Sequence, residues 1–347
     1  MDGADGVRWG VLSTAAIGVR QVIPAMQRGR ASRVTAIASR DPARATRVAA
    51  DLGIPTAHAS YDDLLADPDV DAVYIPLPNH LHVPWSIRAI DAGKHVLCEK
   101  PIGLNRAEAE ALARAAAARP HLKVMEAFMY RFHPQWQRAR QIVDGGAIGE
   151  VRAIHTVFGY FNDDPHNIRN QKDAGGGALM DIGCYGISIA RFVLGREPRR
   201  VMALSEVDPR FGVDRLTSAT MAFDGAIGTF TCATQIARHQ QVDIFGTGGR
   251  IEIELPMNPL SDQPSRIWLQ RGGSPATPGT PATTDEIVLE PSNQYTRQGD
   301  AFSRAVLDRT SVPAPLADAV ANMRVIDAVK ASVECRCWID LAWTPGT

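Results

Sequence analysis

The stretch GVLSTAAIG, Gly10–Gly18, decides the fold of the first half of the chain. The apolar run Val7–Leu12 that leads into it is typical of a buried strand, and the residues after it favour a helix. A strand that turns directly into a helix begins a dinucleotide-binding fold, but on the G-x-G-x-x-G pattern Ser13 and Ala15 replace the first two glycines. Both substitutes are small, and a helix N-terminus still offers N–H groups to an anion. On these residues alone, a cofactor site and an ordinary strand–helix turn are equally good explanations.

Short apolar runs alternate with helical segments from Val7 to about Val124. The runs lack polar alternation, which is typical of parallel strands buried on both faces, so a Rossmann fold with a doubly wound parallel sheet is predicted. Helices are expected up to Gln27 and over Pro42–Leu52, Tyr61–Leu65, His82–Ala92 and Arg106–Ala118, with strands at 33–39, 71–77, 95–100 and 122–127. Ligands of such sheets bind at the carboxyl ends of the strands, where STAAIG, SRD, PLPNH and EKP all fall.

The pattern changes after Arg131 to strands with partial alternation, joined by links such as FDGA and GTGG. Strands are expected over Glu150–Tyr160, Arg199–Asp208, Ser218–Phe223, Ile227–Cys232 and Gln241–Gly246, and helices over Ala178–Leu194, Gln298–Leu307 and Ala317–Glu334. The stretch Gly272–Thr284 is rich in Pro, Gly, Ser and Thr and is predicted to be a mobile loop. We therefore expect an α/β domain over 1–128 and an α+β domain with an open, mostly antiparallel sheet over 129–347.

Composition favours a small-molecule ligand. Lys and Arg total 37 against 38 for Asp and Glu, without long runs of one sign, which gives no support to nucleic acid or an anionic membrane as a partner. No stretch approaches the roughly 18 uninterrupted apolar residues of a membrane span, and the short acidic start is unlike a secretory signal. The five cysteines form neither a disulfide framework nor a zinc motif, so we expect mostly buried thiols and a cytoplasmic protein.

The end of the second predicted strand points to NADP rather than NAD. An NAD site presents Asp or Glu to the ribose 2′-hydroxyl about 20 residues after the fingerprint. This chain has Ser39 and Arg40 there, a hydroxyl and a guanidinium that suit a 2′-phosphate, and Arg44 follows one turn into the next helix. Asp41 is expected to cap that helix.

The combination STAAIG, ASRD, PLPNHLH, EKP, EAFMYRFHPQ and GGGALMDIGCYGI resembles the Gfo/Idh/MocA oxidoreductases over essentially the whole chain. Within that family it is most similar to the branch with NADP-dependent xylose dehydrogenases, dimeric dihydrodiol dehydrogenases and sugar 3-ketoreductases. The resemblance implies that NADP binds to the N-terminal domain and a sugar-like substrate to the C-terminal sheet.

The same resemblance implies that Lys100, of EKP, is a catalytic residue, and that a cis bond precedes Pro101. Lys100 follows a buried strand and precedes a proline, which holds it extended at the ligand-binding edge. Asp181 and Tyr185 are four residues apart on a predicted helix, so both side chains share one face. Many family members have His where this chain has Tyr185. An ammonium nearby would lower the pKa of Tyr185, so that the phenol exchanges a proton with the substrate hydroxyl. The alternative for Tyr185 is an ordinary core residue.

The remaining candidates lie on loops. His80 and His82 are two residues apart and cannot complete a zinc shell, so no metal is expected, and both histidines are predicted to cap or pack. The residues expected to contact the cofactor are Ser13, Thr14, Ala15, Ile17, Ser39, Arg40, Arg44, Leu77, Pro78, Asn79, His82, Glu99, Lys100 and Arg169. The residues expected to contact the substrate are Lys100, Arg131, Asp181, Tyr185 and His239.

The resulting hypothesis is an NADP(H)-dependent oxidoreductase that transfers a hydride between nicotinamide and a secondary carbinol, lactol or ketone of a sugar-like substrate. A trans-dihydrodiol dehydrogenase of the same family and a non-catalytic NADP-binding sensor are the alternatives. A sensor has no physical reason to keep the set of Lys100, Asp181 and Tyr185. An open apolar sheet face is unusual in a monomer, so a homodimer through the C-terminal sheet is predicted.

Overall fold

The computed structural model describes residues 6–273, 279 and 281–343, and the chain forms two compact units. The first unit contains Met1–Met129 and Asn293–Met323, and the second contains Tyr130–Ser292 and Arg324–Thr347. The chain therefore enters the second unit near residue 129, returns to the first, and crosses again within helix α9 (Leu316–Cys335).

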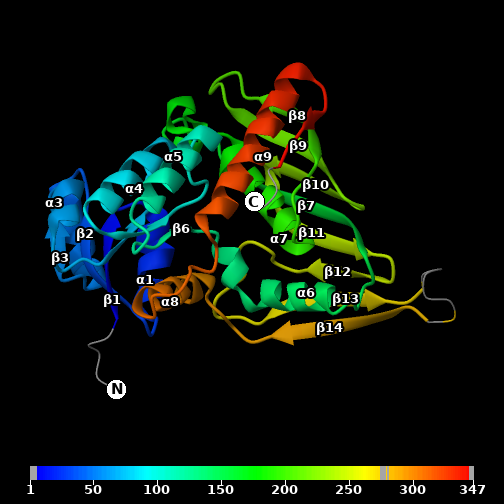
Figure 1. The fold of residues 1–347 in the computed structure, drawn as a ribbon, viewed down its shortest axis with the longest axis horizontal. Helices are drawn as coiled ribbons and strands as arrows, with labels where there is room; N and C mark the ends of the chain where they lie inside the picture. The colour runs from blue at the N-terminus through cyan, green and yellow to red at the C-terminus, as the bar shows by residue number, and fades with distance from the viewer. Residues whose placement is uncertain (1–5, 274–278, 280, 344–347) are drawn as a thin grey trace. The chain divides into compact units, whose positions relative to one another are not determined.

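The first unit is built on a six-stranded parallel sheet with helices on both faces (Figure 1). The strand order is β3-β2-β1-β4-β5-β6, which is the doubly wound order of dinucleotide-binding folds, so the predicted Rossmann fold is confirmed. Its strands are β1 (Val7–Leu12), β2 (Ser32–Ala38), β3 (Thr56–His58), β4 (Ala72–Ile75), β5 (His95–Cys98) and β6 (Val124–Glu126). Its helices are α1 (Ile23–Gln27), α2 (Pro42–Leu52), α3 (Tyr61–Ala66), α4 (His82–Asp91), α5 (Arg106–Ala117) and α8 (Gln294–Leu307).

Helix α8 closes the core of this unit although it comes from the far end of the sequence. It packs beside α1, and its Phe302 and Ser303 meet the fully buried Trp9 of β1, with the indole N–H donating to Ser303 Oγ over 3.0 Å. The Asp300 carboxylate accepts the backbone N–H groups of Arg30 and Ala31 at the start of β2. These contacts fix β1 and β2, whose carboxyl ends carry the predicted nucleotide loops.

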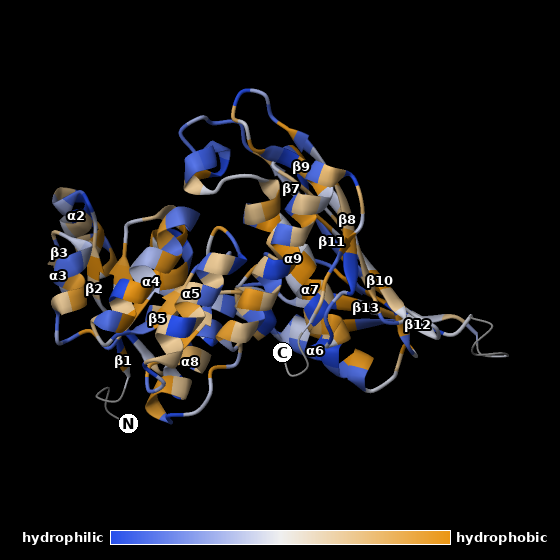
Figure 2. Ribbon diagram, turned by 45° about the horizontal axis from the view of Figure 1, so that its top comes forward, coloured by the Kyte–Doolittle hydropathy of each residue, from blue (hydrophilic) through white to orange (hydrophobic). Residues whose placement is uncertain are grey.

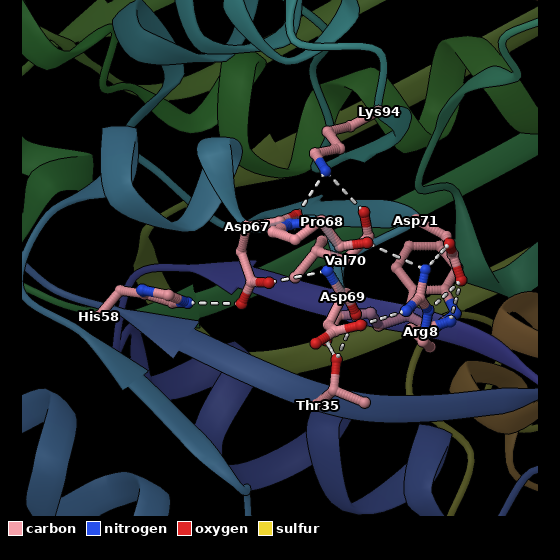
Figure 3. A network of polar contacts seen from close by, with 10 residues as sticks. Arg8, Thr35, His58, Asp67, Pro68, Asp69, Val70, Asp71 and Lys94 are labelled. Atoms are coloured by element: carbon pink, nitrogen blue, oxygen red, sulfur yellow. Dashed lines mark hydrogen bonds and ion pairs between the residues drawn. The ribbon is translucent and has the colours of Figure 1, made fainter.

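A polar network fixes the loop between α3 and β4 at the amino ends of the strands, away from those loops (Figure 3). Arg8 donates to both carboxylate oxygens of Asp71, 2.7 and 3.0 Å away, and to Asp69. The ammonium of Lys94 donates to the carbonyl oxygens of Asp67 and Val70. Burial raises the pKa of Asp71, but the bonds from Arg8 outweigh it, and the net pKa lies below the usual range.

The second unit is a nine-stranded sheet in the order β14-β13-β12-β11-β7-β10-β9-β8-β15. All its neighbouring strands are antiparallel except β10 and β7, which confirms the predicted open, mostly antiparallel sheet. The alternation of hydrophobic and hydrophilic residues along its strands can be followed in Figure 2. The elements are α6 (Pro134–Asp144), β7 (Val151–Phe161), α7 (Cys184–Leu194), β8 (Arg200–Val207), β9 (Asp214–Phe223), β10 (Ala226–Ala233), β11 (Gln235–Gly246), β12 (Gly249–Ile253), β13 (Ser265–Arg271), β14 (Thr283–Leu289) and β15 (Ile339–Asp340). Within the predicted loop Gly272–Thr284, residues 274–278 and 280 lie outside the described residues.

The helix expected over 178–194 is present but starts with a π-helical turn, Leu179–Gly183, before α7. The two glycines of GCYG let it approach the sheet closely, since a Cβ on Gly183 would lie 2.8 Å from Cys232 Sγ and one on Gly186 2.6 Å from the Cβ of Phe230. Within the helical run Lys172–Leu194, an 18-residue window is as apolar as a membrane span, but 89% of this window is buried inside the protein. Packing against the sheet therefore accounts for its hydrophobicity.

The cysteine prediction holds for three residues and is wrong for two. Cys98, Cys184 and Cys232 are buried thiols. Cys335 and Cys337 form an exposed disulfide, which the irregular cysteine spacing did not predict. Arg336, between them, adopts a left-handed φ of 55° at the end of α9, and this turn brings the two sulfur atoms together.

Candidate functional site

The loop after β1 keeps a glycine-type backbone although its first glycine is missing. Ser13 has a φ of 128°, a conformation that side chains rarely adopt, and it is nearly buried. Its hydroxyl lies 3.2 Å from the carbonyl oxygen of Pro76, to which it donates, and accepts the N–H of Ala15 over 3.2 Å. Thr14 is also buried, and Ile17 precedes the π-helical turn Gly18–Val22. The loop therefore turns tightly into a helix N-terminus, the geometry that a pyrophosphate needs.

Hydroxyl and guanidinium groups gather where β2 ends. The hydroxyls of Ser39 and Thr14 are 3.5 Å apart, and Arg44 donates to the carbonyl oxygen of Thr14 over 3.1 Å. Arg40 is exposed, and its guanidinium interacts with the phenol of Tyr61. The Asp41 carboxylate caps α2 by accepting the N–H of Arg44, as predicted. The cationic, hydroxyl-rich donor set that remains fits a 2′-phosphate.

The loop after β4 carries Leu77, Pro78 and Asn79, and it is tied to the next loop by His82. This histidine is 1% exposed, and its ring nitrogens lie 2.7 Å from the carbonyl oxygens of Leu77 and Pro101. Burial lowers the pKa of His82 to about 4, although the hydrogen bonds with Pro101 and Leu77 act in the opposite direction. His82 therefore packs between the two loops, as predicted. Among the described residues, no group of three or more His, Cys, Asp or Glu is placed to hold a metal ion.

The loop after β5 holds Lys100 at the predicted edge of the sheet. The Lys100–Pro101 peptide bond is cis, as the family resemblance implied. The Glu99 carboxylate accepts the Tyr74 hydroxyl over 2.7 Å and the Lys100 N–H over 3.3 Å. On the other side of the proline, the Ile102 N–H donates to Glu126 over 2.7 Å. The carboxylates of Glu99 and Glu126 thus fix the backbone N–H groups of Lys100 and Ile102, before and after the proline.

In the second unit, Tyr185 and Asp181 lie against the same face of β7. The Tyr185 ring packs edge-on to Phe158, with ring centroids 5.7 Å apart, and Asp181 accepts the Tyr160 hydroxyl over 2.5 Å. Phe158 and Tyr160 are two residues apart on one strand, so their side chains share a face. The expected common orientation of Asp181 and Tyr185 is therefore present, although Asp181 lies in the π-helical turn.

The other predicted residues of this unit lie in three different places. Arg169 forms an ion pair with Asp181, with its Nε 2.9 Å from Oδ2. Arg131 donates to Ser188, one turn after Tyr185, over 2.8 Å. His239 is exposed on β11 and pairs with Gly159, which places it on the face of the sheet opposite Phe158 and Tyr160. The structure thus brings Arg169 to Asp181 and Arg131 to the tyrosine-bearing helix, and it separates His239 from both.

Sequence reasoning missed Tyr160 and Asp214. Tyr160 ends the predicted strand, where alternation alone does not distinguish a functional side chain from a packing one. Asp214 accepts the Leu179 N–H over 2.8 Å and the Thr217 hydroxyl over 2.7 Å, and thereby anchors the start of the helix that carries Asp181. Burial raises the pKa of Asp214. Its only sequence signal is a carboxylate at the start of a strand that mixes polar and apolar residues.

Comparisons with known proteins match this architecture. The family model described as "Oxidoreductase family, NAD-binding Rossmann fold" matches residues 7–128, and the GFO/IDH/MocA C-terminal domain matches residues 136–252. An uncharacterised oxidoreductase of Rhizobium meliloti is 45% identical over 337 residues, covering 96% of this chain and 99% of the relative. The NADP⁺-dependent D-xylose 1-dehydrogenase 2 of Haloferax volcanii is 39% identical over 338 residues, covering 96% and 99%.

Among solved structures, a 3-ketoreductase from Actinomadura kijaniata in complex with NADP and TDP-benzene is 32% identical, with a TM-score of 0.87 and coverage of 94% of this chain and 98% of that one. These matches confirm the predicted resemblance, the oxidoreductase class and NADP as the cofactor.

Proposed function

Because the chain belongs to the GFO/IDH/MocA family of oxidoreductases, we propose that it oxidises the lactol carbon of a free aldose with NADP⁺. The pairing of a phenol and a fixed carboxylate, Tyr185 and Asp181, on one face of β7 carries this proposal. The relative from Haloferax volcanii is a xylose dehydrogenase that acts at position 1, which supports the lactol over a ring carbinol.

The reaction converts a lactol and NADP⁺ to a lactone, NADPH and a proton. When bound, NADP⁺ would supply the hydride acceptor for this oxidation, nicotinamide C4. The loop after β1 would hold its pyrophosphate, while Ser39, Arg40 and Arg44 would hold the 2′-phosphate.

Each catalytic residue has a separate part in this proposal. Tyr185 takes the lactol hydroxyl proton through its Oη. Lys100 stabilises the negative charge that develops on the oxygens as that proton leaves. Asp181 accepts a hydrogen bond from a neighbouring substrate hydroxyl and so orients the sugar.

A substrate panel tests the proposal. The enzyme is incubated with NADP⁺ and pentoses, hexoses, a dTDP-sugar or a trans-dihydrodiol, and the absorbance of reduced nicotinamide is followed. Turnover of free aldoses to lactones is expected. Turnover of the dihydrodiol alone would overturn the substrate assignment, and NADP⁺ binding without any turnover would support a regulatory protein instead.

Two variants test the catalytic roles. Lys100→Ala and Tyr185→Phe should each lower kcat by roughly 100-fold or more, because the first removes the charge that stabilises the developing anion and the second removes the group that takes the proton. Tyr185→Phe should leave the affinity for NADP⁺ unchanged in a fluorescence titration, which separates catalysis from cofactor binding. Full activity in either variant contradicts the mechanism.

We further propose a cytoplasmic homodimer that pairs through the outer face of the large sheet, the face opposite Phe158 and Tyr160. The aligned strand registers place Leu204 and Ile227 on this face. Both are large apolar side chains, 67% and 50% exposed, and exposed side chains of this kind favour association.

A further inference from the structure

We propose that Arg169 and Tyr160 are positioning residues for Asp181, which they hold as a fixed, ionised hydrogen-bond acceptor for the substrate. The inference rests on the proposed function for the role of Asp181. The inference adds that Asp181 is ionised and that Arg169 and Tyr160 keep it so. Neither Arg169 nor Tyr160 lies in the sequence motif that contains Asp181.

Both partners reach the same carboxylate oxygen. The Tyr160 hydroxyl donates to Asp181 Oδ2 over 2.5 Å, and the Arg169 Nε lies 2.9 Å from the same atom. The Asp181 side chain is only 12% exposed, whereas that of Arg169 is 40% exposed, so the carboxylate is largely shielded from water although its cationic partner is not. Charge-assisted hydrogen bonds of this kind are roughly twice as strong as neutral ones.

The ionisation states of the two donors agree with this arrangement. Burial and the charge of Asp181 raise the pKa of Tyr160, so its hydroxyl stays protonated and donates. The charge of Asp181 outweighs the effect of burial on Arg169 and raises the pKa of that guanidinium. An ionised carboxylate accepts hydrogen bonds but has no proton to give. Asp181 therefore orients a hydroxyl of the substrate, and proton transfer is left to Tyr185.

The backbone locks Arg169 to the helix that carries Asp181. The Gly177 N–H donates to the carbonyl oxygen of Arg169 over 2.8 Å, and the Asp181 N–H donates to the carbonyl oxygen of Gly177 over 3.0 Å. Gly176 lies so close that a Cβ there would be 2.4 Å from the same Arg169 oxygen. The glycines thus allow the backbone of Arg169 to lie directly against the start of the helix. This contact keeps Arg169 close to Asp181.

This arrangement also limits the substrate. A fixed carboxylate binds a hydroxyl donor well and a carbonyl or ether oxygen poorly, because like lone pairs face each other. The substrate class is therefore a polyhydroxylated compound with a hydroxyl donor next to the reacting carbon. A deoxy analogue that lacks this hydroxyl should lose at least about tenfold in kcat/KM.

The first test needs no substrate. Aspartate labelled with ¹³C in its carboxyl group is incorporated into the enzyme, the Asp181 signal is assigned with Asp181→Asn, and its pH titration is followed by NMR. In Arg169→Met, the carboxyl of Asp181 should take up its proton about one pH unit or more higher than in the parent. Arg169→Lys should restore most of the parent's titration, and Tyr160→Phe should raise the titration midpoint by a smaller amount.

The matched control is Arg199→Met. Arg199 forms an ion pair with Asp224, 3.0 Å away, in which both side chains are about 70% exposed. This variant removes the same charge from the same unit and should leave the Asp181 titration unchanged. An unchanged titration in both Arg169→Met and Tyr160→Phe would overturn the proposal, and Tyr160→Phe keeps the test valid if Arg169→Met fails to fold.

The second test uses the pH profile of kcat/KM with the aldose found in the substrate panel. Protonation of Tyr185 sets the main acid limb, and below it the profile should steepen where Asp181 takes up its proton; this break should lie about one pH unit higher in Arg169→Met than in the parent, so that kcat/KM there is about tenfold lower. A merely structural role would lower kcat/KM equally at every pH, and this outcome would overturn the proposal. Because the NMR test is independent of turnover, failure of the oxidoreductase assignment and failure of this inference give different results.

Discussion

The Ser13 hydroxyl lies 3.2 Å from the carbonyl oxygen of Pro76, and this bond links the turn after β1 to the loop after β4. Ser13 occupies the first glycine position of the nucleotide-binding pattern and keeps the backbone conformation of a glycine, with a φ of 128°. A residue with a Cβ is strained there by roughly 1–3 kcal/mol. Its two hydrogen bonds, to Pro76 and from Ala15, offset that strain.

The pair Ser13→Ala and Ser13→Gly separates strain from hydrogen bonding. Alanine keeps the strain and loses both bonds, so it should lower the free energy of unfolding by about 1–3 kcal/mol and weaken NADP⁺ binding. Glycine loses the bonds but removes the strain, so it should be more stable than the alanine variant. Denaturant titration of the protein without ligand and a fluorescence titration with NADP⁺ measure both effects. Equal stability of the two variants would show that the serine backbone is not strained.

Arg40 should determine the preference for NADP⁺ over NAD⁺. Replacing it with aspartate exchanges a guanidinium for a group that repels the 2′-phosphate, so Arg40→Asp should lower kcat/KM for NADP⁺ by about 100-fold. Activity with NAD⁺, which lacks that phosphate, should be retained. Arg47→Asp, the same charge change at an exposed position of α2 seven residues later, is the control. A parallel loss with both cofactors would argue for a folding defect rather than phosphate recognition.

His82 should make folding stability depend on pH. Its pKa is about 4 in the folded protein and 6.5 when unperturbed, so between these values the unfolded chain binds a proton that the folded one does not. Stability is therefore fully present above pH 6.5 and falls as the pH drops towards 4, by about 3 kcal/mol in total. His82→Gln removes this dependence, and the exposed His239→Gln keeps it. Urea titrations at several pH values measure the slope, and a His82→Gln slope equal to that of the parent contradicts the prediction.

The sequence sufficed for five of the six strands of the first sheet because they are largely buried, and side-chain caps mark the starts of α2, α3 and α5. Pro42–Leu52 was predicted to the residue, since Asp41 caps it and Gly53 ends it with a φ of 63°. The short, largely exposed β3 has no hydrophobic signal and was missed. Strands β12, β13 and β14 were also missed, because their alternating charged residues form ion pairs across the strands, as Arg266 does with Glu254 and Glu286.

The candidate site was predictable only where a local motif carries it. Lys100, Asp181 and Tyr185 each stand in a recognisable run of residues, and so do the hydroxyls and arginines after β2. The partners of these residues come from other parts of the chain. Tyr74 donates to Glu99, 25 residues away in the chain, and Glu126 accepts a hydrogen bond from Ile102, 24 residues away. Hydrophobic periodicity along the sequence cannot predict contacts of this kind. A single sequence therefore identifies the reacting groups and leaves the groups that position them unassigned.

Leu204 on β8 should control the oligomeric state. It is an apolar side chain at 67% exposure on the outer sheet face, and burying it against a second copy would contribute about 1.5–3 kcal/mol per subunit. Leu204→Glu would force a carboxylate into that interface, so it should convert the proposed dimer into a monomer in light scattering after gel filtration. Leu307→Glu is the matched control, because Leu307 is 46% exposed at the end of α8 in the first unit and is not part of the sheet. Since Leu204 lies on the face opposite Tyr160 and Phe158, the monomer should keep the Asp181 titration of the parent. A parent protein that is already monomeric, or a Leu204→Glu variant that stays dimeric, would refute pairing through this face.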